Sequence, residues 1–328
     1  WPVSETDHFI LAKLDSNGII PAVDSKPETL LRRLYFDLIG LPPTPKDIRR
    51  YAAAWKKDPK IAYQKEVEKL LSTERFGERW GRHWLDVVRY AESSGKDINM
   101  TFPHAWRYRD YVVDSFNTDK PYNEFIVEQI AGDLLPIKND EDWQENLIAT
   151  GFLAIGPKNL NERDPRQFAL DLADEQIDTT TQAILGLTVS CARCHDHKSD
   201  PIPTADYYSL AGVFLNTKTY FGTINAVQNR RGTKLLELPI QDKQSVDSLS
   251  SNEISFIKKR LAESEDRLLE LTRQAREDRL AGRSGNAQQQ ALRLRTQISQ
   301  IKGRLNSVDE NGELITRAMG VQDREDFI

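Results

Sequence analysis

Residues 191–198 read CARCHDHK, and they contain both cysteines and two of the five histidines of this 328-residue chain. A Cys-x-x-Cys-His run is typical of covalent attachment of a c-type haem, in which two thiols add to the vinyl groups and the adjacent imidazole binds iron. We therefore expect Cys191 and Cys194 to form thioethers with haem c and His195 to be the proximal iron ligand. This motif is the feature around which we expect the chain to be organised.

Two other interpretations use the same residues. A zinc or non-haem iron site would combine Cys191, Cys194 and His197 with an acidic residue, which are suitable ligand types, although a second cysteine pair is missing. A disulfide or redox-active Cys-x-x-Cys normally lies in a βαβ unit. The residues before Cys191 have a helical pattern instead, so haem attachment is favoured.

The distal haem ligand is the next question, because it sets the redox potential and decides whether a substrate reaches the iron. His83 and His104 are the candidate distal ligands, and Met100 and His8 are further possibilities. His83 falls on a tryptophan-rich stripe with helical spacing, which we expect to be a buried helix face.

The helix expected over residues 166–188 leads into the motif and has two faces. One face is apolar, and on the other the carboxylates gather within roughly one hundred degrees of arc. They are Asp171, Asp174, Glu175 and Asp178. Such a stripe is a solvated or arginine-paired face, or part of an alternative metal site made by Asp174, Glu175 and Asp178 with His197.

Apolar spacing along the chain predicts a mainly α fold. We expect a multi-helix haem domain over 1–245, an antiparallel helical, coiled-coil hairpin over 246–308, and a tail over 309–328 that leads to a missing downstream domain. Within the first domain, alternation around Arg231-Gly232 predicts a small β-hairpin between 219–227 and 233–240. The remaining helices are expected at 4–17, 27–38, 45–55, 63–71, 74–92, 104–116, 121–132, 143–150 and 205–214, with an irregular stretch at 151–165.

Composition narrows the class of protein. The formal net charge is −5, with acidic and basic residues interspersed, so no one-signed field attracts nucleic acid or an anionic membrane. No apolar run approaches the roughly 18 to 20 residues of a transmembrane helix. Two cysteines exclude a scaffold with several disulfides. The chain starts at Trp1 rather than Met, so we expect a mature or excised piece of a longer polypeptide.

Several segments, in this order, resemble the planctomycete-type cytochrome domain, a family of unknown function in large exported proteins of planctomycetes and related bacteria. The segments are LLRRLYFDLIGLPP (30–43), ERWGRHWLDVVRY (78–90), AWRYRDY (105–111), EQIAGDLLP (128–136), ATGF (149–152), DEQIDTTTQAILGLT (174–188) and CARCHDHKSDPIPTADYY (191–208). The resemblance implies an exported, haem-associated protein that is periplasmic or at the cell surface. It also implies that a set of positions recurs in the family: His83, Asp86, Arg107, Arg109, Asp133, Asp174, Glu175, Asp178 and His197.

Two functions follow as hypotheses. The first is an exported electron-transfer cytochrome domain of a larger assembly, with a redox partner protein or a companion domain of the same polypeptide as its partner and the helical hairpin as an assembly element. The alternative is a haem or non-haem metal enzyme, an oxidoreductase or hydrolase that acts on polysaccharide through His195, His197 and the carboxylates of Asp174, Glu175 and Asp178.

Overall fold

A computed structural model describes residues 2, 4–223, 230–240, 248–281, 285–305, 307–309 and 311–324. The chain divides into two compact units, Trp1–Trp80 and Gly81–Ile328, and the boundary falls inside helix α5 (Glu74–Val87). The domain boundaries expected from the sequence stay a prediction.

The first unit is a small helical cluster. Prolines occupy the first turn of α2 (Pro27–Ile39), α3 (Pro45–Trp55) and α4 (Pro59–Leu71), where a missing N–H costs nothing. These three helices enclose a core that includes Leu31, Tyr51 and Leu70. Helix α1 (Glu5–Ser16) begins at a capping box formed by Ser4 and Asp7 and buries none of its residues.

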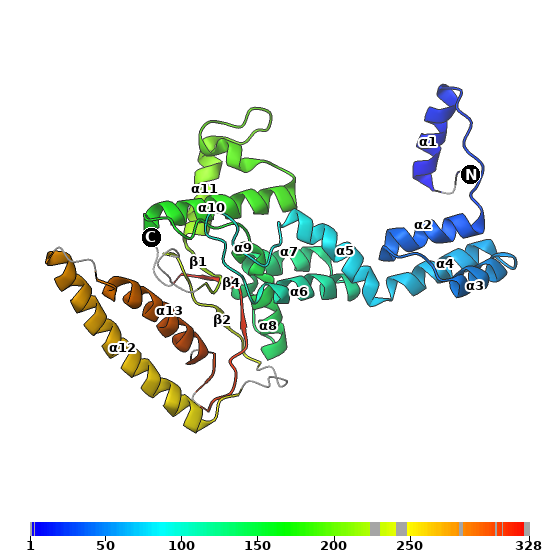
Figure 1. The fold of residues 1–328 in the computed structure, drawn as a ribbon. Coiled ribbons are helices and arrows are strands. Elements are labelled where there is room, and N and C mark those ends of the chain that lie inside the picture. The colour runs from blue at the N-terminus through cyan, green and yellow to red at the C-terminus, as the bar shows by residue number, and fades with distance from the viewer. Residues whose placement is uncertain are drawn as a thin grey trace. The chain divides into compact units, whose positions relative to one another are not determined.

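The second unit is built on an aromatic core. Its helices α6 (Ala105–Asn117), α7 (Tyr122–Ala131), α8 (Asp140–Ala149) and α9 (Gly151–Ala154), with the short 3-10 turn η1 (Gly132–Leu134), lie side by side in Figure 1. Tyr108, Phe125 and Phe152 are almost fully buried among them, and the ring of Trp84 packs against Phe125 and Phe152. Large rings of this kind supply most of the apolar area that such a core removes from water.

The chain then forms the two helices that frame the motif. Helix α10 (Pro165–Thr180) continues as a π-helical turn, η2 (Thr181–Leu185), and ends at Gly186 with φ +66°. The motif starts in a 3-10 turn, η3 (Val189–Arg193), and α11 (Thr204–Leu215) then packs against α10 (Figure 1). The sequence predicted one helix as far as residue 188, and the left-handed glycine ends it earlier.

The strands pair differently from the prediction. Strand β1 (Thr217–Tyr220) is antiparallel to β4 (Gly320–Asp323), and β2 (Leu236–Glu237) is antiparallel to β3 (Arg317–Ala318). The predicted β-hairpin is therefore wrong in its pairing, and residues 224–229 of it lie outside the described residues. The alternating pattern predicts which residues form a strand, but it does not predict the partner strand. Here the partners of β1 and β2 come from much later in the chain and are selected by a common buried face. That face joins Leu147, Leu236, Leu238 and Ala318 in one cluster.

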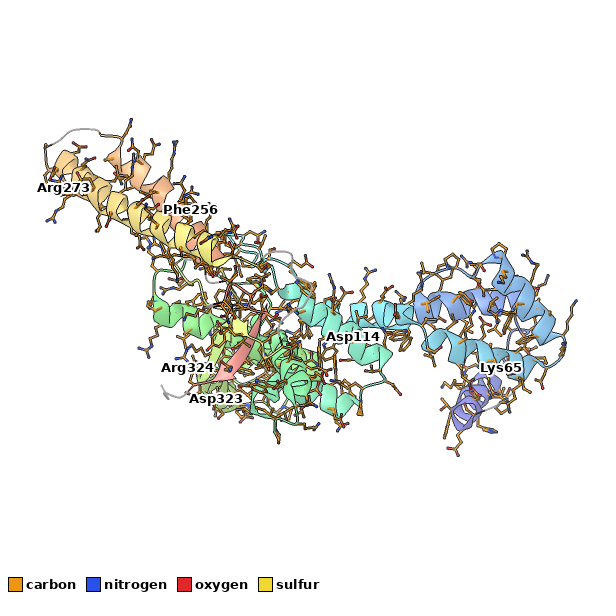
Figure 2. All side chains as sticks on the ribbon, turned by 90° about the horizontal axis from the view of Figure 1, so that it is seen from below. Lys65, Asp114, Phe256, Arg273, Asp323 and Arg324 are labelled. Atoms are coloured by element: carbon orange, nitrogen blue, oxygen red, sulfur yellow. The ribbon has the colours of Figure 1, made fainter. Side chains whose placement is uncertain are left out.

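The C-terminal helices form the expected antiparallel hairpin. Helix α12 (Ser251–Leu280) packs on α13 (Ala287–Leu305), and Ile254 near the start of α12 meets Val308 just beyond the end of α13. At the other end Leu271 packs on Ala287 and Ala291. Figure 2 shows the side chains of Phe256 and Arg273 projecting from α12.

The mainly α architecture predicted from the sequence is confirmed. Helices dominate both units, and the strands form only two short antiparallel pairs among the described residues. Within the same residues, no helix is both long enough and apolar enough to span a bilayer. The motif is therefore held between helices α10 and α11, and strand β4, from the C-terminal end of the chain, pairs with β1 directly after α11.

One buried hydroxyl joins β4 to this frame, and its removal tests the strand pairing. Thr150 is fully buried, donates to the carbonyl of Leu147 (2.7 Å) and accepts from the N–H of Val321 (2.9 Å). Thr150→Val leaves that N–H without its acceptor, so we expect the free energy of unfolding to fall by about 1–3 kcal/mol in urea titrations. Thr150→Ser keeps the hydroxyl and is the matched control. A valine variant at least as stable as the serine variant would contradict this account.

Candidate functional site

The thiols and the imidazole of the motif all face solvent. Cys191 lies in η3, Cys194 is the residue that ends this turn, and both are free and exposed. The exposed His195 has its Nδ1 2.8 Å from the backbone carbonyl oxygen of Asp196. A carbonyl only accepts, so Nδ1 carries the hydrogen and the neutral ring keeps a lone pair on Nε2. The motif thus presents two thiols and one ligand nitrogen.

Asp174 on α10 ties the motif to its frame. Its Oδ2 accepts from Nη1 of Arg193, inside the motif, at 2.9 Å, and its Oδ1 accepts from the hydroxyl of Tyr207 on α11 at 2.5 Å. The negative charge of Asp174 raises the pKa of Arg193, and burial together with this bond raises the pKa of Tyr207. One carboxylate therefore joins α10, the motif and α11.

Three further hydrogen bonds hold the motif along its length. Ser190, directly before Cys191, donates its hydroxyl to Oδ1 of Asp178 on α10. The hydroxyl of Tyr208 donates to the carbonyl of Arg193 (3.1 Å), and the N–H of Thr204 donates to Oδ1 of Asp196 (2.8 Å). The loop is held at its start, middle and end by neighbouring helices.

His197 is engaged within the loop. Its Nδ1 accepts from the backbone N–H of Asp200 at 2.9 Å, so the neutral ring carries its hydrogen on Nε2, which lies 3.1 Å from Oγ1 of Thr188. Its own N–H donates to the carbonyl of Ile202 (2.9 Å). The ring therefore spans the motif and the turn after it.

The alternative metal site is not assembled among the described residues. In the parts of the chain that the structure describes, no three His, Cys, Asp or Glu side chains form a group that could hold one metal ion. Asp174 and Asp178 are bonded to Arg193 and Ser190, and the ring of His197 is used as described above. The alternative stays a prediction.

The candidate distal ligands lie in different surroundings. His83 is exposed, so its predicted burial is wrong: the core-facing stripe of this stretch is Gly81, Trp84 and Val88, and His83 is about one hundred degrees from Trp84. His104 is half-buried at the start of α6 and lines a cavity of about 710 Å³. Met100 packs against the main core, and His8 is exposed on α1 in the first unit.

The four carboxylates of α10 line one pocket, as their predicted common face requires. Its volume is about 560 Å³, and its wall includes Ser190 beside the motif. Glu175, one of these carboxylates, forms an ion pair with Arg89. Burial raises the pKa of Glu175 against the lowering effect of Arg89 and Lys158.

Lys158 also lines this pocket, and sequence reasoning missed it. It is 2% exposed, and its Nζ contacts the carbonyl oxygens of Ile155 (3.3 Å) and Gly156 (3.2 Å) between the rings of Phe102 and Phe221. Burial lowers the pKa of Lys158 to about 8. Only the position of Lys158 in the long irregular stretch at 151–165 hinted at a role.

Comparison with known proteins gives a family. Residues 5–219 match the model of PSCyt2, whose description is "Protein of unknown function (DUF1549)". The chain belongs to the PSCyt2 family. The resemblance to planctomycete-type cytochrome domains predicted from the sequence is thereby confirmed at the level of the family. No curated protein and no solved structure matches the chain. The PSCyt2 match contains both the motif and the pocket.

The buried ammonium of Lys158 predicts a pH dependence of stability. An unfolded lysine has a pKa near 10.5, so between about pH 8 and 10.5 the unfolded chain binds more protons than the folded chain. The free energy of unfolding should therefore rise with pH across this window. In urea titrations at pH 7.5 and 9.5, we expect the wild type to gain about 1–3 kcal/mol relative to Lys158→Met. Parallel pH profiles of the two proteins would show that the ammonium is not penalised by burial.

Proposed function

We propose that this PSCyt2 protein is a c-type haem protein that transfers single electrons within a larger exported assembly. The observation that carries the proposal is the hydrogen bond from Nδ1 of His195 to the Asp196 carbonyl, because it leaves Nε2 as a ligand beside two exposed thiols. Two thiols and a neighbouring imidazole are the donor set that haem c requires, so the residues present fit the group. Cys191, Cys194 and His195 would hold it.

The chain's own residues then act by positioning. When bound, haem c supplies an iron centre that gains and loses one electron. Asp174 and Asp178 hold the motif on α10 through Arg193 and Ser190, so the spacing of the thiols is set before attachment. The acceptor at Nδ1 fixes the tautomer and the orientation of the His195 ring, as partners of ligand histidines do elsewhere.

The partner and the location follow from the same proposal. Thioether attachment implies an extracytoplasmic compartment, so we assign the protein to the periplasm or the cell surface. The partner is a redox protein or a companion domain of the same polypeptide, and the α12–α13 hairpin is the assembly element. Large apolar side chains on the hairpin support this role: Phe256 is 67% exposed, and Leu269 is 71% exposed.

Haem attachment can be tested directly. The chain is exported in a host that matures c-type cytochromes, and a pyridine haemochrome spectrum and an intact mass are recorded. We expect a Soret band and a mass increase of one haem, retained under denaturing conditions. Cys191→Ser and Cys194→Ser should each disrupt the two-thioether product, whereas the exposed control Ser199→Ala should leave it intact. A wild-type chain with neither Soret band nor haem mass sinks the proposal.

The spin state tests the distal ligand. A six-coordinate, low-spin iron is the state expected of an electron carrier, and His83 and His104 are its first candidate distal ligands. We expect one of the variants His83→Ala and His104→Ala to convert the absorption and EPR spectra from low spin to high spin, and the other to serve as its control. If both spectra match the wild type, neither histidine is the ligand. A high-spin wild type that binds added ligands favours the enzyme hypothesis.

A further inference from the structure

A pocket beside the motif is built from residues that haem attachment does not use. It is lined by residues of α10, by residues 96–97 and 157–159 and by Ser190, and its volume lies within the range typical of small-molecule sites. Its lining combines carboxylates with Lys96, Asn159 and the ring of Phe168. Cys191, Cys194 and His195 are not among the residues that line it.

The carboxylates are held in place but keep acceptor capacity. Oδ1 of Asp171 accepts from Gln167 (2.7 Å), Oδ1 of Asp178 accepts from Ser190, and Oε1 of Glu175 pairs with Arg89. A carboxylate offers about four lone-pair sites, so each retains capacity for a ligand. Oε2 of Glu175 is buried and accepts no hydrogen bond from any residue that the structure describes. A buried oxygen of this kind is costly unless something else donates to it.

The charges around the pocket indicate the class of ligand. Arg89 and Arg193 already pair with Glu175 and Asp174, and two further cations, Lys96 and the buried Lys158, are among the lining residues. These four cations nearly balance the five carboxylates of the lining, Asp97, Asp171, Asp174, Glu175 and Asp178, so the pocket has little net charge for a ligand ion to neutralise. A neutral ligand with several hydroxyl donors suits this lining best, because each O–H can donate to a fixed carboxylate.

The pocket also has an apolar part. Phe168, Leu172 and Pro157 line it together with the carboxylates. These groups offer van der Waals contact to C–H surfaces while the acidic wall takes hydroxyls. A polyhydroxylated ring has both kinds of surface.

We propose that this pocket is a binding site for a neutral polyhydroxylated molecule, a sugar or polyol, with Asp171, Glu175 and Asp178 as hydroxyl acceptors. The site goes beyond electron transfer and does not depend on haem, since it is made by other residues. The backbone around it is specialised: Gly156 has φ +106°, and a Cβ there would clash with both Glu175 and Arg89.

Three ligands that share one ring test the charge argument. Glucose is neutral, glucuronate is its anionic analogue and glucosamine its cationic analogue. In isothermal titration calorimetry with the full chain, we expect saturable glucose binding with a Kd of about 1 mM and weaker binding of both charged analogues. No saturable heat with glucose overturns the proposal. Binding of either charged analogue as tight as that of glucose also overturns it.

Two isosteric variants test the location. We expect Asp171→Asn and Asp178→Asn each to weaken glucose binding by about tenfold, because a hydroxyl bond to a charged acceptor becomes one to a neutral amide. Asp206→Asn, an exposed substitution on α11 outside the lining, is the matched control. Both variants are compared with the control by urea unfolding to separate binding from stability. Wild-type affinity in both folded variants would place glucose elsewhere and overturn the proposal.

Discussion

The paired carboxylate of Asp174 is the interaction on which the rest of the site depends. It lies on α10, accepts from Arg193 in the motif and accepts from Tyr207 on α11. Tyr207 is almost fully buried, so its hydroxyl needs a partner, and a carboxylate is a strong one. Through this one group, two helices and the motif loop take up one arrangement.

This arrangement explains how an exposed, irregular loop is held in place. Only the start of the motif lies in a 3-10 turn, which ends at Arg193 and gives little stability by itself. Ala192, between the two cysteines, is fully buried, whereas the thiols on either side face solvent. Because Ala192 is buried and Arg193 is bonded to Asp174, the loop is anchored between the two cysteines, and both thiols stay accessible to solvent. Hydrogen bonds from the neighbouring helices and the packing of Ala192 in the main core thus hold the loop together.

Helix α10 also lines the pocket beside the motif. Asp174 and Asp178 face both the motif and the pocket, while Glu175 between them is paired with Arg89. Arg89 has φ +50°, a conformation that is costly for a side chain of this size and that persists only when surrounding contacts impose it. The ion pair with Glu175 is one such contact. The strained backbone of Arg89 and its ion pair with Glu175 therefore lie next to α10, the helix that both holds the motif and lines the pocket.

Sequence reasoning reached the local features of this site and missed the non-local ones. The acidic face of α10 follows from helical spacing, and the helical hairpin follows from its heptads, so both were predictable. The bond from Tyr207 to Asp174 joins residues on different helices, and no periodic pattern encodes it. The prediction for His83 failed even though it used a local pattern. The tryptophan-rich stretch indicated that His83 is buried, whereas the side chain that faces the core is the next one, Trp84. The strand partners of β1 and β2 were missed because pairing across a long separation depends on tertiary packing.

The most direct test of the central claim is hydrogen exchange in the motif loop. In this account Asp174 orders the loop before any group is attached, so the amides of Cys191 and His197, which donate to Thr188 and Ile202, are protected. In the haem-free chain, Asp174→Asn should speed their exchange by about tenfold relative to Asp206→Asn, equivalent to about 1.4 kcal/mol of local opening free energy. Equal exchange rates in the two variants would show that the loop is ordered without Asp174 and would contradict the account.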